Sequence, residues 1–312
     1  MTATRSPRQA TAEALFGSAA RGQVDKLSDR DYLIVDDDVT LLHERTAELN
    51  AEGWSVASYT FAKLQTLHRK GALFVQHLKD ESRIVCDSEG RLRNLLETFS
   101  PKKSYADEIS ANARLAWLIH TRPNTARGHL WACDVLYVAL RNFGILRQAE
   151  RGSFVFSYDG VIRNLIDSKT VSAAAGSTLL KLRLFKALYR SDESFASPQI
   201  EATLTRALKH LPRDWFPPVS YAVAPEQVLH GLDALPAIAT AYERMRNLEK
   251  GLAAACAVVP GFSHSPEALK LMSWIHNPRA YASHAARAED TSIRTLQKAL
   301  DLLRNDRSRF AG

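Results

Sequence analysis

The sequence predicts an α+β protein in which a small mixed-sheet domain is followed by an all-α domain. Three observations lead to this prediction. Strand-like apolar runs alternate with helical spacing in the first third of the chain, the later segments all have helical spacing, and a polar, proline-containing stretch at residues 100–103 separates the two patterns. We therefore expect domains at residues 1–100 and 104–312, with a possible sub-boundary in the helical domain near residues 212–218.

The elements of the first domain follow from local patterns. We expect a helix at residues 40–53, because Leu41, Leu42 and Leu49 have helical spacing and Gly53 ends the run. Short runs rich in β-forming residues predict the strands, and the turn at residues 87–90 closes the last of them. The expected strands are residues 13–16, 31–37, 54–61 and 83–86, and the other expected helices are residues 62–80 and 91–99.

The second domain is predicted to contain only helices. Proline and glycine residues interrupt its apolar periodicity and so divide it into segments. Residues 154–158 fit either a short strand or an apolar loop. The expected helices are residues 104–120, 127–149, 160–191, 197–211, 225–258, 265–276 and 289–308.

Composition narrows the functional classes. Cys86, Cys133 and Cys256 are few and widely spaced, which argues against a disulfide framework and a structural zinc site. No apolar run is long enough to span a bilayer, and residues 1–14 lack a signal-peptide core, so we expect a cytoplasmic protein with no membrane partner. The net charge of +7 fits either a nucleic-acid partner or a soluble enzyme with a basic surface.

Residues 15–31 combine the features that phosphoryl chemistry requires. Gly17-Ser18 forms a small-residue turn after an apolar run, and glycine lets the backbone approach a phosphate closely. Asp29 and Asp31 open the next apolar run, and residues two apart on a strand share a face. Their carboxylates can therefore converge on the divalent ions that assist phosphoryl transfer.

The ordered set Gly17-Ser18, Arg21-Gly22 and Ser28-Asp29-Arg30-Asp31 resembles the motif of the nucleotidyltransferase superfamily that includes DNA polymerase beta. The nearest likeness is to small bacterial nucleotidyltransferases of toxin–antitoxin and defence loci, and it covers about a third of the chain. The resemblance implies a nucleotidyltransferase fold for residues 1–100 and an ATP- or other NTP-dependent transferase that uses Mg²⁺ or Mn²⁺. It implies catalytic, metal-binding roles for Asp29 and Asp31, and nucleotide binding by Gly17, Ser18, Arg21, Lys26 and Ser28.

The resemblance also implies that a nucleoside monophosphate moves from the NTP to a hydroxyl. The basic charge favours RNA, such as a tRNA end, as the acceptor, and a hydroxyl of a cognate protein is the other expectation. Active relatives usually carry a third carboxylate on the third strand, where this chain has Ser55 or, in another alignment, Ala57. Two interpretations follow. Either Asp29 and Asp31 suffice and another group such as His77 activates the hydroxyl, or the fold is a catalytically degenerate module that binds nucleotide, nucleic acid or a partner.

Overall fold

The computed structural model describes residues 10–22, 25, 27–117, 119, 126–190, 198–211, 252, 264–275 and 294. The chain divides into two compact units. The first comprises Met1–Ala106 and Gly144–Val161, and the second comprises Asp107–Phe143 and Ile162–Gly312. The change of pattern expected at residues 100–103 thus falls inside the first unit, which also includes a segment from later in the chain.

The first unit is built on a four-stranded mixed sheet, as the sequence predicts. Its strands are β1 (Ala12–Phe16), β2 (Asp31–Val35), β3 (Ser55–Tyr59) and β4 (Ser82–Asp87), in the spatial order β3-β2-β1-β4. β1 pairs antiparallel with both β2 and β4, whereas β2 and β3 are parallel. The parallel pair is joined by a helical crossover, as parallel strands require.

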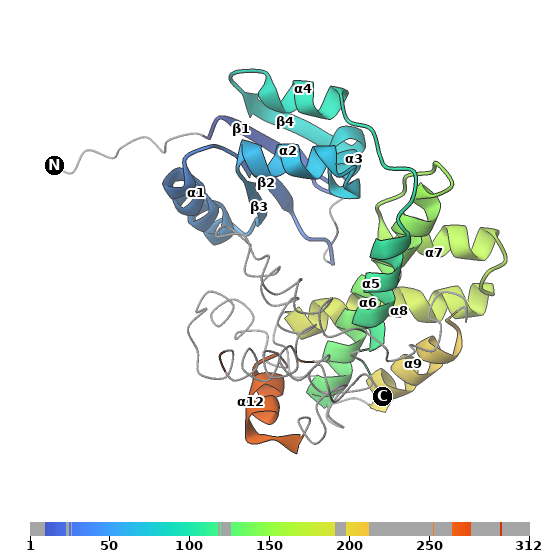
Figure 1. Cartoon of the computed structure of the whole chain (residues 1–312). Coiled ribbons are helices and arrows are strands. Elements are labelled where there is room, and N and C mark those ends of the chain that lie inside the picture. Colours follow the sequence, from blue (N-terminus) through green and yellow to red (C-terminus); the bar gives the residue numbers. More distant parts are fainter. Residues whose placement is uncertain are drawn as a thin grey trace, which may run out of the picture. The chain divides into compact units, whose positions relative to one another are not determined.

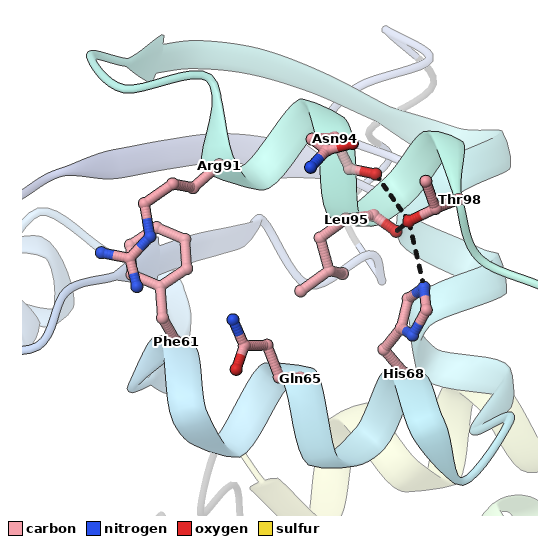
Figure 2. Close-up of a pocket in the computed structure, with 7 residues that line it drawn as sticks. All are labelled: Phe61, Gln65, His68, Arg91, Asn94, Leu95 and Thr98. Carbon is pink, nitrogen blue, oxygen red and sulfur yellow. Dashed lines mark hydrogen bonds between the residues drawn. The ribbon is translucent and has the colours of Figure 1, made fainter.

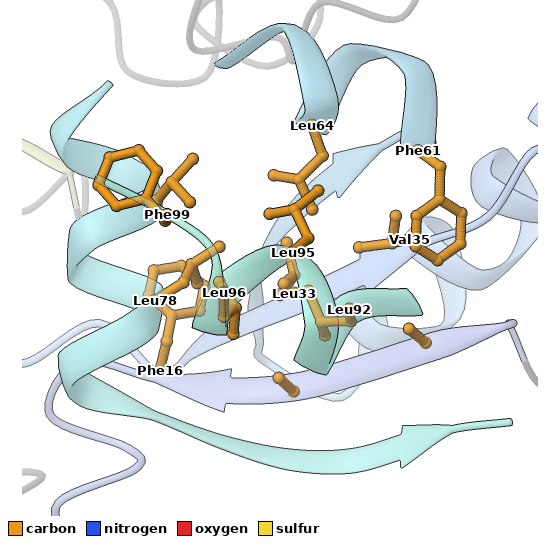
Figure 3. Close-up of a cluster of buried hydrophobic side chains, with 13 residues drawn as sticks. Phe16, Leu33, Val35, Phe61, Leu64, Leu78, Leu92, Leu95, Leu96 and Phe99 are labelled. Carbon is orange, nitrogen blue, oxygen red and sulfur yellow. The ribbon is translucent and has the colours of Figure 1, made fainter. Parts of the chain in front are cut away.

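Helices cover both faces of this sheet (Figure 1). One face packs against α1 (Val39–Ala51) through Tyr32 and Ile34. The other face packs against α2 (Phe61–Arg69), α3 (Leu73–Glu81) and α4 (Arg91–Glu97). Figure 3 shows the main core of the unit on this second face, formed by side chains that include Phe16, Leu33, Val35, Phe61, Leu64, Leu78, Leu92, Leu95, Leu96 and Phe99.

The single helix predicted at residues 62–80 is wrong, because the chain breaks it at Gly71. Gly71 has a φ of +62°, and its N–H donates to the carbonyl of His68, which closes α2. A Cβ on Gly71 would lie only 2.6 Å from the main-chain nitrogen of Lys102. Two separate helices, α2 and α3, therefore replace the long helix, and Ala72, in an extended conformation, is the N-cap residue of α3.

The described part of the second unit is helical. Together with the mixed sheet of the first unit, this confirms the predicted α+β class. The helix expected at residues 160–191 is wrong, since Lys169, at a φ of +57°, lies in the break between two shorter helices. Residues 154–157 form a loop, so the loop alternative holds. The later helices are α5 (Ala106–Trp117), α6 (Ala126–Ala149), α7 (Tyr158–Asp167), α8 (Ala173–Arg190), α9 (Pro198–Lys209) and α12 (Pro266–Ile275), with the unit division falling inside α6 and α7.

Two of the helices predicted for the second unit cannot be compared with the structure. The helices expected at residues 225–258 and 289–308 lie outside them, apart from the helical positions Leu252 and Arg294. None of the helices in the described ranges has the length and apolar character needed to cross a bilayer.

Asp36 directly follows β2 and binds Thr11, the residue before β1. Its Oδ2 accepts hydrogen bonds of 2.7 Å from both the N–H and the hydroxyl of Thr11, and its Oδ1 accepts one of 2.8 Å from the N–H of Asp38. Burial alone would raise the pKa of this carboxyl, but these hydrogen bonds outweigh burial and lower the pKa. The charged form of Asp36 therefore stabilises the fold.

We expect the free energy of unfolding to fall in acid, partly because of Asp36. A carboxyl with a lowered folded pKa contributes stability above its unfolded pKa, about 3.9, and loses that contribution as pH falls through the folded pKa. Asp36→Asn should cost about 1.5–3 kcal/mol at pH 7, the usual range for hydrogen bonds to a charged group. Urea denaturation from about pH 7 to 3 measures this. The gap between wild type and Asp36→Asn should narrow in acid, whereas Asp37→Asn, at an exposed neighbour, should change little.

Candidate functional site

A tight turn at the end of β1 brings Gly17 against the start of β2. Gly17 has a φ of +60°, and its N–H donates to the carbonyl of Glu81 over 3.0 Å. A Cβ at this position would lie 3.2 Å from Oδ2 of Asp31. Glycine adopts a positive φ with little strain and leaves this space open. The Gly-Ser turn therefore lies where the positive φ and the nearby Asp31 carboxylate both favour glycine.

Asp29 and Asp31 lie where β2 begins, and Ser18 connects the turn to them. The hydroxyl of Ser18 donates to the carbonyl of Asp29 over 3.1 Å. Leu33 and Val35, further along β2, are buried in the core beneath α2, α3 and α4. Because strand side chains alternate, Asp31 faces the same side of the sheet, with its Oδ2 near Gly17. The Gly-Ser turn and Asp31 thus meet at one end of the sheet.

Ser55 lies beside Asp31 on the neighbouring strand. The parallel register pairs Asp31 with Ser55 and Leu33 with Ala57. Ala57 packs against the buried core, whereas Ser55 is exposed at the first position of β3. Of the two alternatives from the sequence, Ser55 therefore occupies the position next to the carboxylates. Its neutral hydroxyl is a poorer ligand for a hard cation than a carboxylate.

Glu81 and His77 complete the polar cluster on the α3 side. Nε2 of His77 lies 3.1 Å from Oε2 of Glu81, and the same Glu81 oxygen forms an ion pair with the guanidinium of Arg21. The imidazole stacks on Phe156, with ring centroids 4.4 Å apart, and meets the edge of Phe16. Its Nε2 would lie 3.7 Å from a Cβ on Gly17. The ring is therefore packed beside the Gly17 turn.

Sequence reasoning did not select Glu81, although a signal for it was present. Glu81 follows His77 by four positions, a spacing that brings two side chains together on one face of a helix. The sequence also indicates Arg21 as a phosphate ligand, and the structure brings this guanidinium to Glu81. Since Glu81 also accepts the N–H of Gly17 through its carbonyl, one residue connects the turn, the arginine and the histidine.

The loop between β1 and β2 contains the remaining predicted nucleotide ligands. Ser28 donates its hydroxyl to the carboxylate of Asp25 over 2.8 Å, and the main chain of Asp25 donates back to that hydroxyl over 3.3 Å. In this structure Ser28 therefore shapes the loop. Lys26 lies outside the described residues. Arg30, between the two aspartates, covers the ring of Trp54 at 3.9 Å and belongs to the α1 side of the sheet.

The donor set of the site fits a metal that arrives with a nucleotide better than a resident metal. Among the described residues, no three His, Cys, Asp or Glu side chains are grouped so that they could hold an ion. Asp29 and Asp31 provide two carboxylates at the start of β2. Mg²⁺ is commonly held by one or two carboxylates together with substrate phosphates, so two carboxylates match the number of protein ligands in such a complex.

Comparisons with known proteins identify no relative of this chain. No protein-family model matches the chain, and searches of curated proteins and of solved structures give no match.

Proposed function

We propose that the first unit is a nucleotidyltransferase domain that moves a nucleoside monophosphate from an NTP to a hydroxyl acceptor. The observation that carries the proposal is the junction of the Gly17-Ser18 turn with the Asp29 and Asp31 segment. A glycine-dependent turn beside two carboxylates is the arrangement that a metal–triphosphate complex needs. The resemblance of the motif to the nucleotidyltransferases supports the same assignment.

In this proposal the residues have separate tasks. Asp29 and Asp31 would hold the Mg²⁺ or Mn²⁺ ion, and the ion would neutralise charge on the phosphates. Gly17, Ser18 and Arg21 position the triphosphate. An acceptor oxygen forms a bond to the α-phosphorus, the bond to the leaving pyrophosphate breaks, and the hydroxyl proton passes to a base. Positioning and electrostatic stabilisation account for most of the rate.

The acceptor in this proposal is RNA or a hydroxyl of a partner protein. The net charge of +7 favours RNA as the acceptor, because Lys and Arg side chains attract its phosphate backbone.

A second candidate function has its own support in the structure. Ser55 stands beside Asp31 where an acidic residue would complete a three-carboxylate site, and the described residues contain no larger metal-binding group. These observations favour a degenerate member that binds nucleotide, nucleic acid or a partner without catalysis. The two candidate functions differ in whether the protein transfers a nucleotide from an NTP to an acceptor.

Transfer is tested by incubating the full chain with each α-³²P-labelled NTP, Mg²⁺ or Mn²⁺, and either total RNA or cell lysate. We expect a labelled acceptor with the wild type. Because Asp29→Asn and Asp31→Asn each remove a charged metal ligand, we expect them to reduce labelling by about a hundredfold or more. Glu44→Gln, on the exposed side of α1, is the matched loss of one negative charge and should label normally.

Failure to label any acceptor with any NTP and metal, while the wild type still binds an NTP or RNA, would support the degenerate module instead. Equal labelling by wild type and Asp31→Asn would show that the transfer occurs at another site.

A further inference from the structure

Arg30 is an exposed arginine that lies on an aromatic ring at the end of the sheet where β2 begins. The Cζ of its guanidinium is 3.9 Å from the centroid of the Trp54 ring. Trp54 packs against the core beneath α1 and meets the ring of Tyr32 at a centroid distance of 5.2 Å. The carbonyl of Arg30 accepts the N–H of Ser55 over 2.8 Å. A solvent-facing positive charge therefore has a packed aromatic support.

The charge of Arg30 has no carboxylate partner. Within the described part of the chain, its guanidinium forms neither an ion pair nor a hydrogen bond. Several other arginines of the first unit differ in this respect, including the one that lines the groove between α2 and α4 in Figure 2. Their ion pairs are Arg21–Glu81, Arg45–Glu13 and Arg91–Asp37. Arg30 can therefore bind an anion without first giving up an ion pair.

The stacked geometry of Arg30 indicates which anion it fits. A guanidinium on an aromatic ring uses one flat face, and its N–H groups point outward in the guanidinium plane. Two of these N–H groups can pair with two oxygens of a phosphate. Because Arg30 is exposed, an unpaired base can stack on its outer face, as bases do on arginines in RNA recognition. Single-stranded RNA offers both contacts, whereas a carboxylate of a protein offers only the first.

Arg30 also lies next to the proposed metal ligands but reaches the other face of the sheet. It stands between Asp29 and Asp31, and neighbouring Cα atoms are about 3.8 Å apart. Asp31 lies near Gly17, whereas Arg30 reaches Trp54 on the α1 side. The position therefore suits the strand of an acceptor whose end reaches the carboxylates, rather than a triphosphate at the Gly17 turn. A metal ion on the carboxylates would offset their repulsion of that strand.

We propose that Arg30, supported by Trp54, is a contact for single-stranded RNA beside the transfer site. A phosphate of the strand pairs with the edge of the guanidinium, and an unpaired base stacks on its outer face. The role of this RNA as the acceptor rests on the proposed function, and the contact selects RNA over a hydroxyl of a partner protein. Binding of the RNA does not require transfer, so it can be measured separately.

The test is the binding of a fluorescein-labelled single-stranded oligoadenylate to the full chain, followed by fluorescence anisotropy in Mg²⁺ without NTP. Arg30→Gln removes both contacts and should raise the Kd about tenfold. It should also make the slope of log K against log salt less steep by about 0.7, the value for one phosphate contact on a single strand. Arg30→Lys keeps the charge but not the flat fork, so it should raise the Kd and leave the salt slope unchanged.

Arg93→Gln is the matched control. It removes the same charge from an exposed arginine of α4, on the other face of the sheet, and should leave the Kd unchanged. Equal weakening by Arg30→Gln and Arg93→Gln would overturn the proposal, because it would show only general attraction by net charge. The proposal would also be overturned if Arg30→Gln weakened the binding of Mg-ATP but not of RNA, or if the wild type bound an acidic peptide and no RNA.

A transfer assay separates the failure of this proposal from the failure of the proposed function. With an active wild type, Arg30→Gln should raise the KM for RNA and leave the KM for NTP unchanged. If the wild type transfers no label but Arg30→Gln still loses RNA binding, the RNA contact stands and the transferase activity does not. If Arg30→Gln transfers label with the wild-type KM for RNA, the activity stands and the RNA contact is wrong.

Discussion

Ser55→Asp is expected to raise the rate of nucleotidyl transfer by about tenfold to a hundredfold, the scale on which single positioned electrostatic groups act in catalysis. Ser55 pairs with Asp31 in the parallel register and is exposed at the start of β3. A carboxylate there would join the two existing ones and provide a third charged oxygen ligand for the metal. Because the position is exposed, the change should cost little stability. The measurement is the initial rate of label transfer at saturating NTP and metal.

Ser55→Asn is the matched control, since it has nearly the shape of aspartate without the charge. It should leave transfer at the wild-type level. If Ser55→Asp transfers label no faster than the wild type, Ser55 does not border the metal complex as proposed. If the wild type is inactive and Ser55→Asp gains transfer, the natural protein is the degenerate binding module, and the aspartate restores a lost ligand.

Glu13→Ala is expected to lower the free energy of unfolding by about 3–5 kcal/mol, the typical cost of removing one partner from a buried ion pair. Glu13 lies on β1, only 1% exposed, on the face that α1 covers. Its carboxylate accepts a hydrogen bond of 2.6 Å from the hydroxyl of Tyr32 and one of 3.1 Å from Nε of Arg45. Burial and the Glu13 carboxylate raise the pKa of Tyr32, and the hydrogen bond from Arg45 to Glu13 raises the pKa of Arg45. Alanine would leave both groups without this partner.

Urea denaturation at pH 7 measures this decrease in the free energy of unfolding. Two further variants separate the contributions of the individual contacts. Tyr32→Phe removes only one hydrogen bond and should cost about 0.5–1.5 kcal/mol. Glu48→Ala removes the exposed carboxylate that also contacts Arg45 and should cost less than about 1 kcal/mol. A change below about 1 kcal/mol for Glu13→Ala would mean that water replaces the carboxylate and that this network does not anchor α1 to the sheet.

The sequence predicts the sheet well because its signals are local. The continuous apolar run from Tyr32 to Val35 is bounded by Asp31 and Asp36, and the turn at residues 87–90 separates β4 from α4. Gly71 shows where local signals failed. The apolar spacing continues across it, so the sequence favours one helix, but the approach of Lys102 and the positive φ at Gly71 require a break. The break between α2 and α3 therefore depends on a contact between residues that are distant in sequence.

The sequence by itself determined the α+β order of elements and the candidate residues Gly17, Ser18, Asp29 and Asp31. These depend on periodicity and motif spacing, which are properties of neighbouring residues. Only the tertiary structure decided that Ser55 rather than Ala57 lies beside Asp31, because strand register is set by side chains packing across the sheet. It also decided that Glu81 joins Arg21 and His77 to the Gly17 turn. Such contacts close long loops, and no local pattern specifies which distant side chains will meet.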